Sequence, residues 1–195
     1  MVLSNCFRKF SGLTEFPIII DVNNVVYERN NGLNKPILND FILLSSELLS
    51  SGFKKELIYP ICDPKLIYNI DKRYELEALI HDCVIMCAPK SADEFILSIA
   101  IKLTLKFGFC FIISNDKFRD FNDQLPSKKW LAKRRVPFMF VGDNICLCPN
   151  IALNDIEILL KNKNINEEIL KNKSKRTTLD VLGDIEKTDG EFKLF

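Results

Sequence analysis

The chain has 195 residues, of which 47% are hydrophobic and 27% are charged, and its formal net charge is +1. These values are typical of a soluble globular domain with an appendage. The near-zero charge excludes a global field that would attract nucleic acid, so any basic patch must be local. No apolar stretch reaches the roughly 18 residues that a membrane helix needs, and the residues after Met1 lack a signal-peptide pattern. We therefore expect a cytoplasmic protein with no membrane partner.

Short apolar runs alternate with helical patterns along the chain. After an N-terminal extension, residues 1–15, the apolar runs predict strands at 15–21, 56–62, 83–88, 109–113 and 137–141. Apolar residues at helical spacing predict helices over 39–52, 71–80 and 93–108, and a loop is expected at 28–36. Gly52 and Gly108 would end the first and last of these helices. This alternation is typical of an α/β fold with three α/β/α layers and a mainly parallel central sheet, here over residues 16–150.

Residues 151–195 differ from the rest of the chain. They contain one amphipathic helix, predicted over 152–163, followed by a highly charged tail with few apolar residues. We expect the helix to pack on its own domain, with a homodimer left open, and the tail to be partly flexible.

The seven cysteines do not suggest a metal site. They form no C-x-x-C pair, and the single histidine, His81, cannot complete a Cys/His zinc set. Most lie within apolar runs, so we expect reduced thiols in the core.

Acidic residues fall where the predicted strands end. Asp21 ends the first strand, Asp116 follows the fourth, and Asp93 begins the helix before the fourth. Asp120 lies four residues after Asp116, which on a helical turn would put both carboxylates on one face. Ligands of open α/β sheets bind beyond the carboxyl ends of the strands, so we expect these four acids to converge.

Clustered carboxylates raise each other's pKa unless a cation neutralises them. Mg²⁺ or Mn²⁺ would suit such oxygen ligands, and beside a phosphodiester it could activate water. The ordinary alternative is that Asp93 and Asp116 cap helices and that Asp120 is a solvated surface acid.

Three segments carry a family resemblance. Asp21-Val22-Asn23-Asn24 resembles a D-G-S-N motif, residues 91–96 (SADEFI) resemble D-D-R-F-I, and residues 114–120 (SNDKFRD) resemble S-N-D-x-Y-R-D. These are motifs of NYN/PIN-like ribonucleases of the Regnase (MCPIP) type. The segment after Trp130 that ends in PFMFVGD (137–143) is similar to the last strand of that family. The resemblance covers about residues 16–150.

The resemblance implies a PIN-like fold and metal-dependent endonucleolytic cleavage of single-stranded or loop RNA. Water would attack phosphorus and leave a 5′-phosphate and a 3′-hydroxyl. By analogy one or two Mg²⁺ or Mn²⁺ ions would be held by Asp21, Asp93, Asp116 and Asp120. Asn24 would orient an acid or a water, and Ser114 and Asn115 would support the site.

The sequence departs from the family pattern at two points. Val22 replaces the glycine of D-G-S-N, and Ala92 replaces the first acid of D-D, so the metal shell is expected to be thinner. The zinc finger that often accompanies the domain is absent from this sequence, so RNA affinity must come from other residues. Our candidates are Lys90, Arg119, Lys128, Lys129, Lys133, Arg134 and Arg135, with Trp130 stacking on a base.

Other readings of the same residues stay open. The basic residues at 127–135 could form a solvated helix face with Trp130 packed inward. The loss of an acid at Ala92 motivates a nuclease-dead RNA-binding or scaffold domain. A haloacid-dehalogenase-like phosphatase needs two acids in a D-x-D motif, and in this sequence the position of the second acid holds Asn23, so this alternative is disfavoured. A nuclease for structured RNA, for example in tRNA 5′ processing, would use the same acids.

Overall fold

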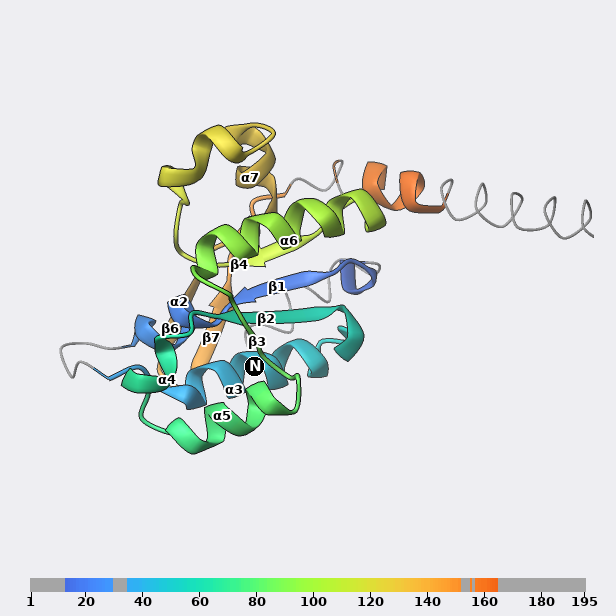
Figure 1. Ribbon diagram of the computed structural model, residues 1–195. Coiled ribbons are helices and arrows are strands. Elements are labelled where there is room, and N and C mark those ends of the chain that lie inside the picture. Colours follow the sequence, from blue (N-terminus) through green and yellow to red (C-terminus); the bar gives the residue numbers. More distant parts are fainter. Residues whose placement is uncertain (1–12, 30–34, 152–154, 156, 165–195) are drawn as a thin grey trace, which may run out of the picture. The chain divides into compact units, whose positions relative to one another are not determined.

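The computed structural model (Figure 1) describes residues 13–29, 35–151, 155 and 157–164. The chain divides into two compact units between Ile156 and Glu157. The described part of the second unit is helical over 157–164. The start of the helix predicted over 152–163, and the tail predicted to be partly flexible, lie outside the described residues.

The first unit is built on a five-stranded parallel sheet with the strand order β3-β2-β1-β4-β5. Each of these strands is short, and all but β5, which is Arg135-Val136, are mainly apolar, as expected for strands covered on both faces. The sheet confirms the predicted α/β class. The strands are β1 (Ile18–Asp21), β2 (Ile58–Cys62), β3 (Met86–Cys87), β4 (Phe111–Ile113) and β5 (Arg135–Val136).

Helices cover both faces of this sheet. In Figure 1, α6 (Ala92–Phe107) and α7 (Lys128–Arg134) lie on one side, and α3 (Leu38–Ser50) and α5 (Arg73–His81) on the other. The predicted helix 93–108 is confirmed as α6, and it ends at Gly108, which has the left-handed φ of 81° that a C-terminal glycine accommodates. The other described helices are α2 (Val22–Glu28), α4 (Leu66–Asn69), and the 3₁₀ turns η1 (Leu13–Glu15), η2 (Lys55–Leu57) and η3 (Arg119–Gln124).

The strand predicted at 137–141 exists, but it does not belong to the central sheet. β6 (Phe138–Val141) pairs antiparallel with β7 (Asn144–Leu147) in a separate two-stranded sheet. The fifth position of the central sheet is taken by β5, which ends just before Pro137. Proline has no N–H to donate to a ladder, so Pro137 separates the two sheets.

Arg29 attaches this β6–β7 hairpin to the helices. Its Nε donates to Oδ1 of the buried Asp40 at 2.9 Å, and its Nη1 donates to the carbonyl oxygen of Gly142 at 3.0 Å. The guanidinium also lies 4.5 Å from the ring centroid of Phe140. One side chain thus joins α2, α3 and the hairpin.

The cysteines follow the prediction only in part. Every described cysteine is free, and Cys62 and Cys110 are buried, but Cys83 and Cys148 are exposed. Cys83 is exposed because β3 is shorter than the predicted strand 83–88, so this residue lies in the loop before it. Cys6 lies outside the described residues. No helix in the described ranges is long and apolar enough to cross a membrane.

Candidate active site

Asp21 lies at the carboxyl end of the central strand β1 and is almost fully buried, with 3% of its surface exposed. Its Oδ1 accepts a hydrogen bond from the backbone N–H of Asn24 at 3.1 Å, which makes Asp21 the N-cap of α2. Its Oδ2 accepts from the hydroxyl of Ser114 at 2.8 Å. Ser114 follows β4, the neighbouring strand, so the carboxylate is fixed at the point where the strand order reverses. Such switch points are where open α/β sheets bind ligands.

Two asparagines connect this point to the flanking strands. The side-chain oxygen of Asn23 accepts from the backbone N–H of Asp63, which follows β2, at 2.7 Å. The side-chain oxygen of Asn24 accepts from the backbone N–H of Asn115, which follows β4, at 2.7 Å. The sequence predicted that Asn24 orients an acid or a water. Its backbone N–H does orient Asp21, while its side chain holds the next loop.

The loop after β4 is held by its own polar groups. The Asp116 N–H donates to the Ser114 hydroxyl at 3.0 Å, and Asp116 Oδ1 accepts from the Phe118 N–H at 2.7 Å. Asn115 exchanges hydrogen bonds of 2.9 Å with both backbone groups of Phe138, which connects the loop to β6. Ser114 and Asn115 thus hold this loop against Asp21 and β6, and their support of a metal site stays a prediction.

The prediction that Asp116 and Asp120 share one helical turn is wrong. Between them Phe118 adopts a left-handed φ of 48°, a conformation that is uncommon for a bulky residue. Phe118 is also 2% exposed and packs in the core, which holds the backbone in this turn. Asp120 consequently lies on η3 and not on one helical turn with Asp116, and both carboxylates are exposed.

The charges of these acids nevertheless interact with one another. The pKa of Asp21 is raised from 3.8 to about 6, chiefly by burial and in smaller part by the charges of Asp93 and Asp116, while its two hydrogen bonds act in the opposite direction. The pKa of Asp93 is also raised, first by burial and then by Asp116, Asp63 and Asp120. The charges that act on these two carboxylates are those of neighbouring acids, so like charges are held close together at this end of the sheet. Asp93 is not a helix cap, because the N-cap of α6 is Ser91.

Asp63 is a member of this cluster that the sequence interpretation missed. It directly follows β2, which pairs with β1, and it acts on the pKa of Asp93. Its position after an apolar strand was a usable signal, the same one that identified Asp21.

The geometry limits how a metal ion could be held. Within the described ranges, no group of three or more His, Cys, Asp or Glu side chains is arranged so that it could hold one. Mg²⁺ is commonly bound by one or two carboxylates, several waters and substrate phosphates. The hard oxygen donors of Asp21, Asp93 and Asp116, whose like charges interact, fit that mode and not a closed protein cage.

Arg134 and Trp130 do not lie as predicted for RNA contacts. Arg134 is 8% exposed, donates to the Thr104 hydroxyl at 3.3 Å, and lies over the rings of Phe109 and Trp130 at 4.6 and 4.4 Å. Trp130 packs against the core cluster. The alternative of an inward-facing tryptophan is therefore the correct one, and Arg134 belongs to the same packing.

The other predicted basic residues differ in their exposure and in their partners. Arg135 is half-buried, and its Nη1 donates to the carbonyl oxygens of Ser114 and Asn115, both at 3.3 Å. Lys133 pairs with Asp155 at 3.1 Å. The side chain of Lys128 lies outside the described residues. Exposed positions are occupied by Lys90, Arg119 and Lys129.

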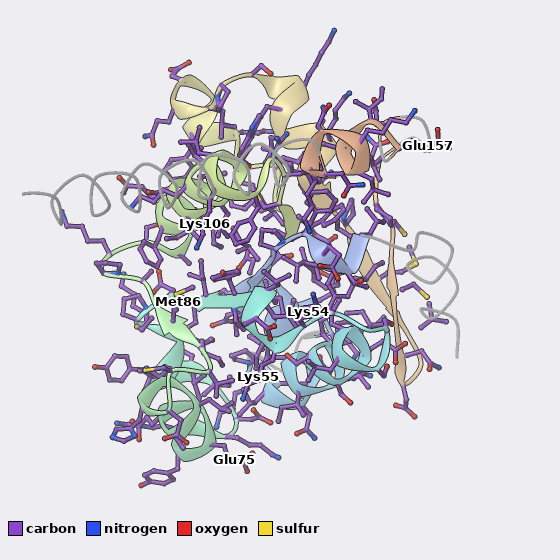
Figure 2. All side chains as sticks on the ribbon, turned by 90° about the vertical axis from the view of Figure 1, so that its right-hand side faces the viewer. Lys54, Lys55, Glu75, Met86, Lys106 and Glu157 are labelled. Carbon is purple, nitrogen blue, oxygen red and sulfur yellow. The ribbon has the colours of Figure 1, made fainter. Side chains whose placement is uncertain are left out.

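The cavities that described residues line include the following two. One cavity has a volume of about 470 Å³ and is lined by residues that include Lys55 and Met86. Both residues are labelled in Figure 2. The lining of this cavity includes the start of β2, at the opposite end of the strands from the acids. A smaller one of about 230 Å³ lies beside Asp93, where it is lined by Lys90, Ser91 and Glu94 among others. Only the smaller cavity adjoins the candidate site.

Comparisons with known proteins agree with this geometry. The family model described as "Zc3h12a-like Ribonuclease NYN domain" matches residues 15–162. Two solved structures of nuclear RNase P 2 (PRORP2) from Arabidopsis thaliana share the fold, with TM-scores of 0.54 and 0.53 and sequence identities of 23% and 22%. Each match covers 74% of this chain and 33% of the other, so the chain spans about a third of those proteins. A search of curated protein sequences gave no significant match.

Proposed function

The chain belongs to the Zc3h12a-like ribonuclease NYN domain family, and from this premise we propose that it is an endoribonuclease that depends on Mg²⁺ or Mn²⁺. Its substrate would be single-stranded or loop RNA. The observation that carries the proposal is the position of Asp21, which is buried at the switch point of the sheet, is fixed by Ser114, and interacts with the like charges of Asp93 and Asp116. A divalent cation would reduce the cost of holding these charges together.

One or two of the carboxylates of Asp21, Asp93 and Asp116 would bind the cation directly, and the remaining acids, with Asp63 and Asp120, would act through water. When bound, the cation would supply activation of the attacking water and neutralisation of charge on the scissile phosphate. Asp63 thus joins the acids predicted from the sequence, and Asp120 has the more distant role because of the Phe118 turn.

The protein's own residues would fix the reacting geometry. The Ser114 hydroxyl and the Asn24 N–H hold both oxygens of Asp21, so the carboxylate needs little reorganisation when the cation and substrate bind. Arg135 lies against the loop that carries Asp116, where its guanidinium could also contact a phosphate. Lys90, Arg119 and Lys129 are exposed and suited to the RNA backbone.

The test is cleavage of a labelled circular single-stranded RNA, which has no ends, so any product reports an internal cut. Wild type with Mg²⁺ or Mn²⁺ is compared with wild type in EDTA and with the Asp116→Asn variant. Asparagine keeps the oxygen that accepts from the Phe118 N–H but loses the charge. The matched control is Asp123→Asn, an exposed acid on η3. We expect cleavage by wild type and by the control only.

Other outcomes decide between the alternatives. RNA binding without cleavage under either metal would support a nuclease-dead binding domain, which the loss of an acid at Ala92 motivates. Preferential cleavage of a precursor tRNA included in the same assay would support a nuclease for structured RNA. A cytoplasmic location and a homodimer also remain proposals, and cell fractionation and light scattering test them.

A further inference from the structure

The cavity beside Asp93 has the features of a binding subsite that adjoins the acids. Its volume is about 230 Å³, and it is lined by Pro89, Lys90, Ser91, Glu94, Phe95 and Ser98. Drug-sized ligands occupy pockets of about 300–1,000 Å³, so this one suits a single ring system. Because Asp93 lies between lining residues Ser91 and Glu94 on the first turn of α6, an occupant would sit next to the proposed cleavage site.

The lining combines one fixed aromatic ring with flexible polar groups. Phe95 is half-buried and packs against the core cluster, so its ring can present a surface without being free to move away. Proteins that bind single-stranded RNA stack bases on such rings. Ser91 and Ser98 supply hydroxyl groups that can donate or accept, and the exposed Lys90 can reach a phosphate.

The carboxylate of Glu94 limits which chemical groups the cavity can bind. Its carboxylate makes no hydrogen bond or ion pair within the described part of the chain, and it stands where the family's D-D-R-F-I motif has arginine. A negative charge beside the RNA path repels phosphates, so it is unsuited to the backbone. It can instead accept hydrogen bonds from N–H groups of a base edge.

Guanine is the base whose Watson–Crick edge presents two adjacent N–H donors, at N1 and N2, which match the two oxygens of a carboxylate. Adenine, cytosine and uracil each place an acceptor next to their donor, and that acceptor would face the carboxylate. We propose that the cavity is a subsite for a guanine base of the RNA substrate, with Glu94 as the specificity-determining residue and Phe95 as the stacking surface. This inference rests on the proposed function.

The experiment uses short oligouridine RNAs with one central guanosine, inosine or adenosine. Inosine lacks the 2-amino group and so tests the second hydrogen bond. We expect wild type to cut at a fixed distance from guanosine with kcat/KM at least about fivefold above that for adenosine, the size expected for a bidentate base contact, and inosine to fall between them. The Glu94→Gln variant keeps one acceptor but places an N–H donor against a guanine donor, and its amide matches the donor and acceptor of the adenine edge. The ratio of guanosine to adenosine cleavage should therefore fall to about one or below.

The control is Glu28→Gln, an exposed carboxylate on α2, which should keep the guanosine preference. Equal cleavage of all three RNAs by wild type, or a preference that survives Glu94→Gln, overturns the subsite. Fluorescence anisotropy of the same RNAs in EDTA separates this proposal from the nuclease itself. If wild type cleaves nothing but binds the guanosine RNA more tightly, and Glu94→Gln removes the difference, the subsite stands and the proposed activity fails. Equal binding without cleavage overturns both.

Discussion

Replacing Asp21 by asparagine is expected to stabilise the metal-free protein at neutral pH while it removes ribonuclease activity. Asp21 is 3% exposed, and its pKa is raised from 3.8 to about 6, chiefly by burial. The folded state therefore holds the proton more tightly than the unfolded state does. Each unit of pKa corresponds to about 1.4 kcal/mol, so the charged carboxylate costs the fold about 3 kcal/mol above pH 6.

The sign of the pH dependence follows from the same values. Because the pKa is higher in the folded state, the destabilisation is complete above pH 6, shrinks as pH falls, and vanishes below the ordinary pKa of 3.8. At pH 5 about half of it should remain by linkage. Asparagine has the shape of the protonated acid and can still accept from the Asn24 N–H, so the variant should lack this pH dependence.

Urea denaturation in EDTA at pH 7.5 and pH 5 measures both quantities, with Glu28→Gln as the control for loss of an exposed carboxylate. We expect the variant to be more stable than wild type by about 1–3 kcal/mol at pH 7.5, allowing for a weaker bond to Ser114, and the gap to narrow at pH 5. Mn²⁺ should stabilise wild type and not the variant. A variant less stable than wild type at pH 7.5 would refute the reasoning, because it would mean that the hydrogen bonds outweigh the burial of charge.

Three further predictions concern residues around the site. Asn24→Ala should lower kcat at least tenfold with little change in KM, because the loop after β4 loses its hydrogen bond to the Asn24 side chain. Single-turnover cleavage measures this, and an unchanged kcat would contradict it. Arg29→Met should destabilise the fold by about 3 kcal/mol in urea denaturation, because Asp40 is left buried and unpaired. A variant as stable as wild type would show that the contact between Arg29 and Asp40 is dispensable. Arg134→Ala should lower the melting temperature without changing the salt dependence of RNA binding. Lys129→Ala should instead reduce that salt dependence and leave the melting temperature unchanged. The reverse pattern would show that Arg134 contacts RNA.

The sequence by itself determined the features that depend on local patterns. Apolar runs specify short strands whether or not their partners are known, and helical spacing closed by Gly108 specifies α6. An acid after an apolar strand identified Asp21 and Asp116, and with the motifs it identified the family. Asp63 also follows an apolar strand, but the sequence did not identify it as a site residue, because its distance from Asp93 depends on β2 lying next to β1.

Only the tertiary structure decided the contacts between segments that are far apart in the chain. Arg134 has the same local surroundings as the exposed Lys129, yet it is buried because α7 packs its side chain over Phe109. The left-handed turn at Phe118 accompanies the burial of its ring in the core, so Asp116 and Asp120 do not share one helical turn. The hairpin β6–β7 leaves the central sheet at Pro137 and is fixed by Arg29. Each outcome depends on the free energy of packing against distant residues, which local sequence patterns do not encode.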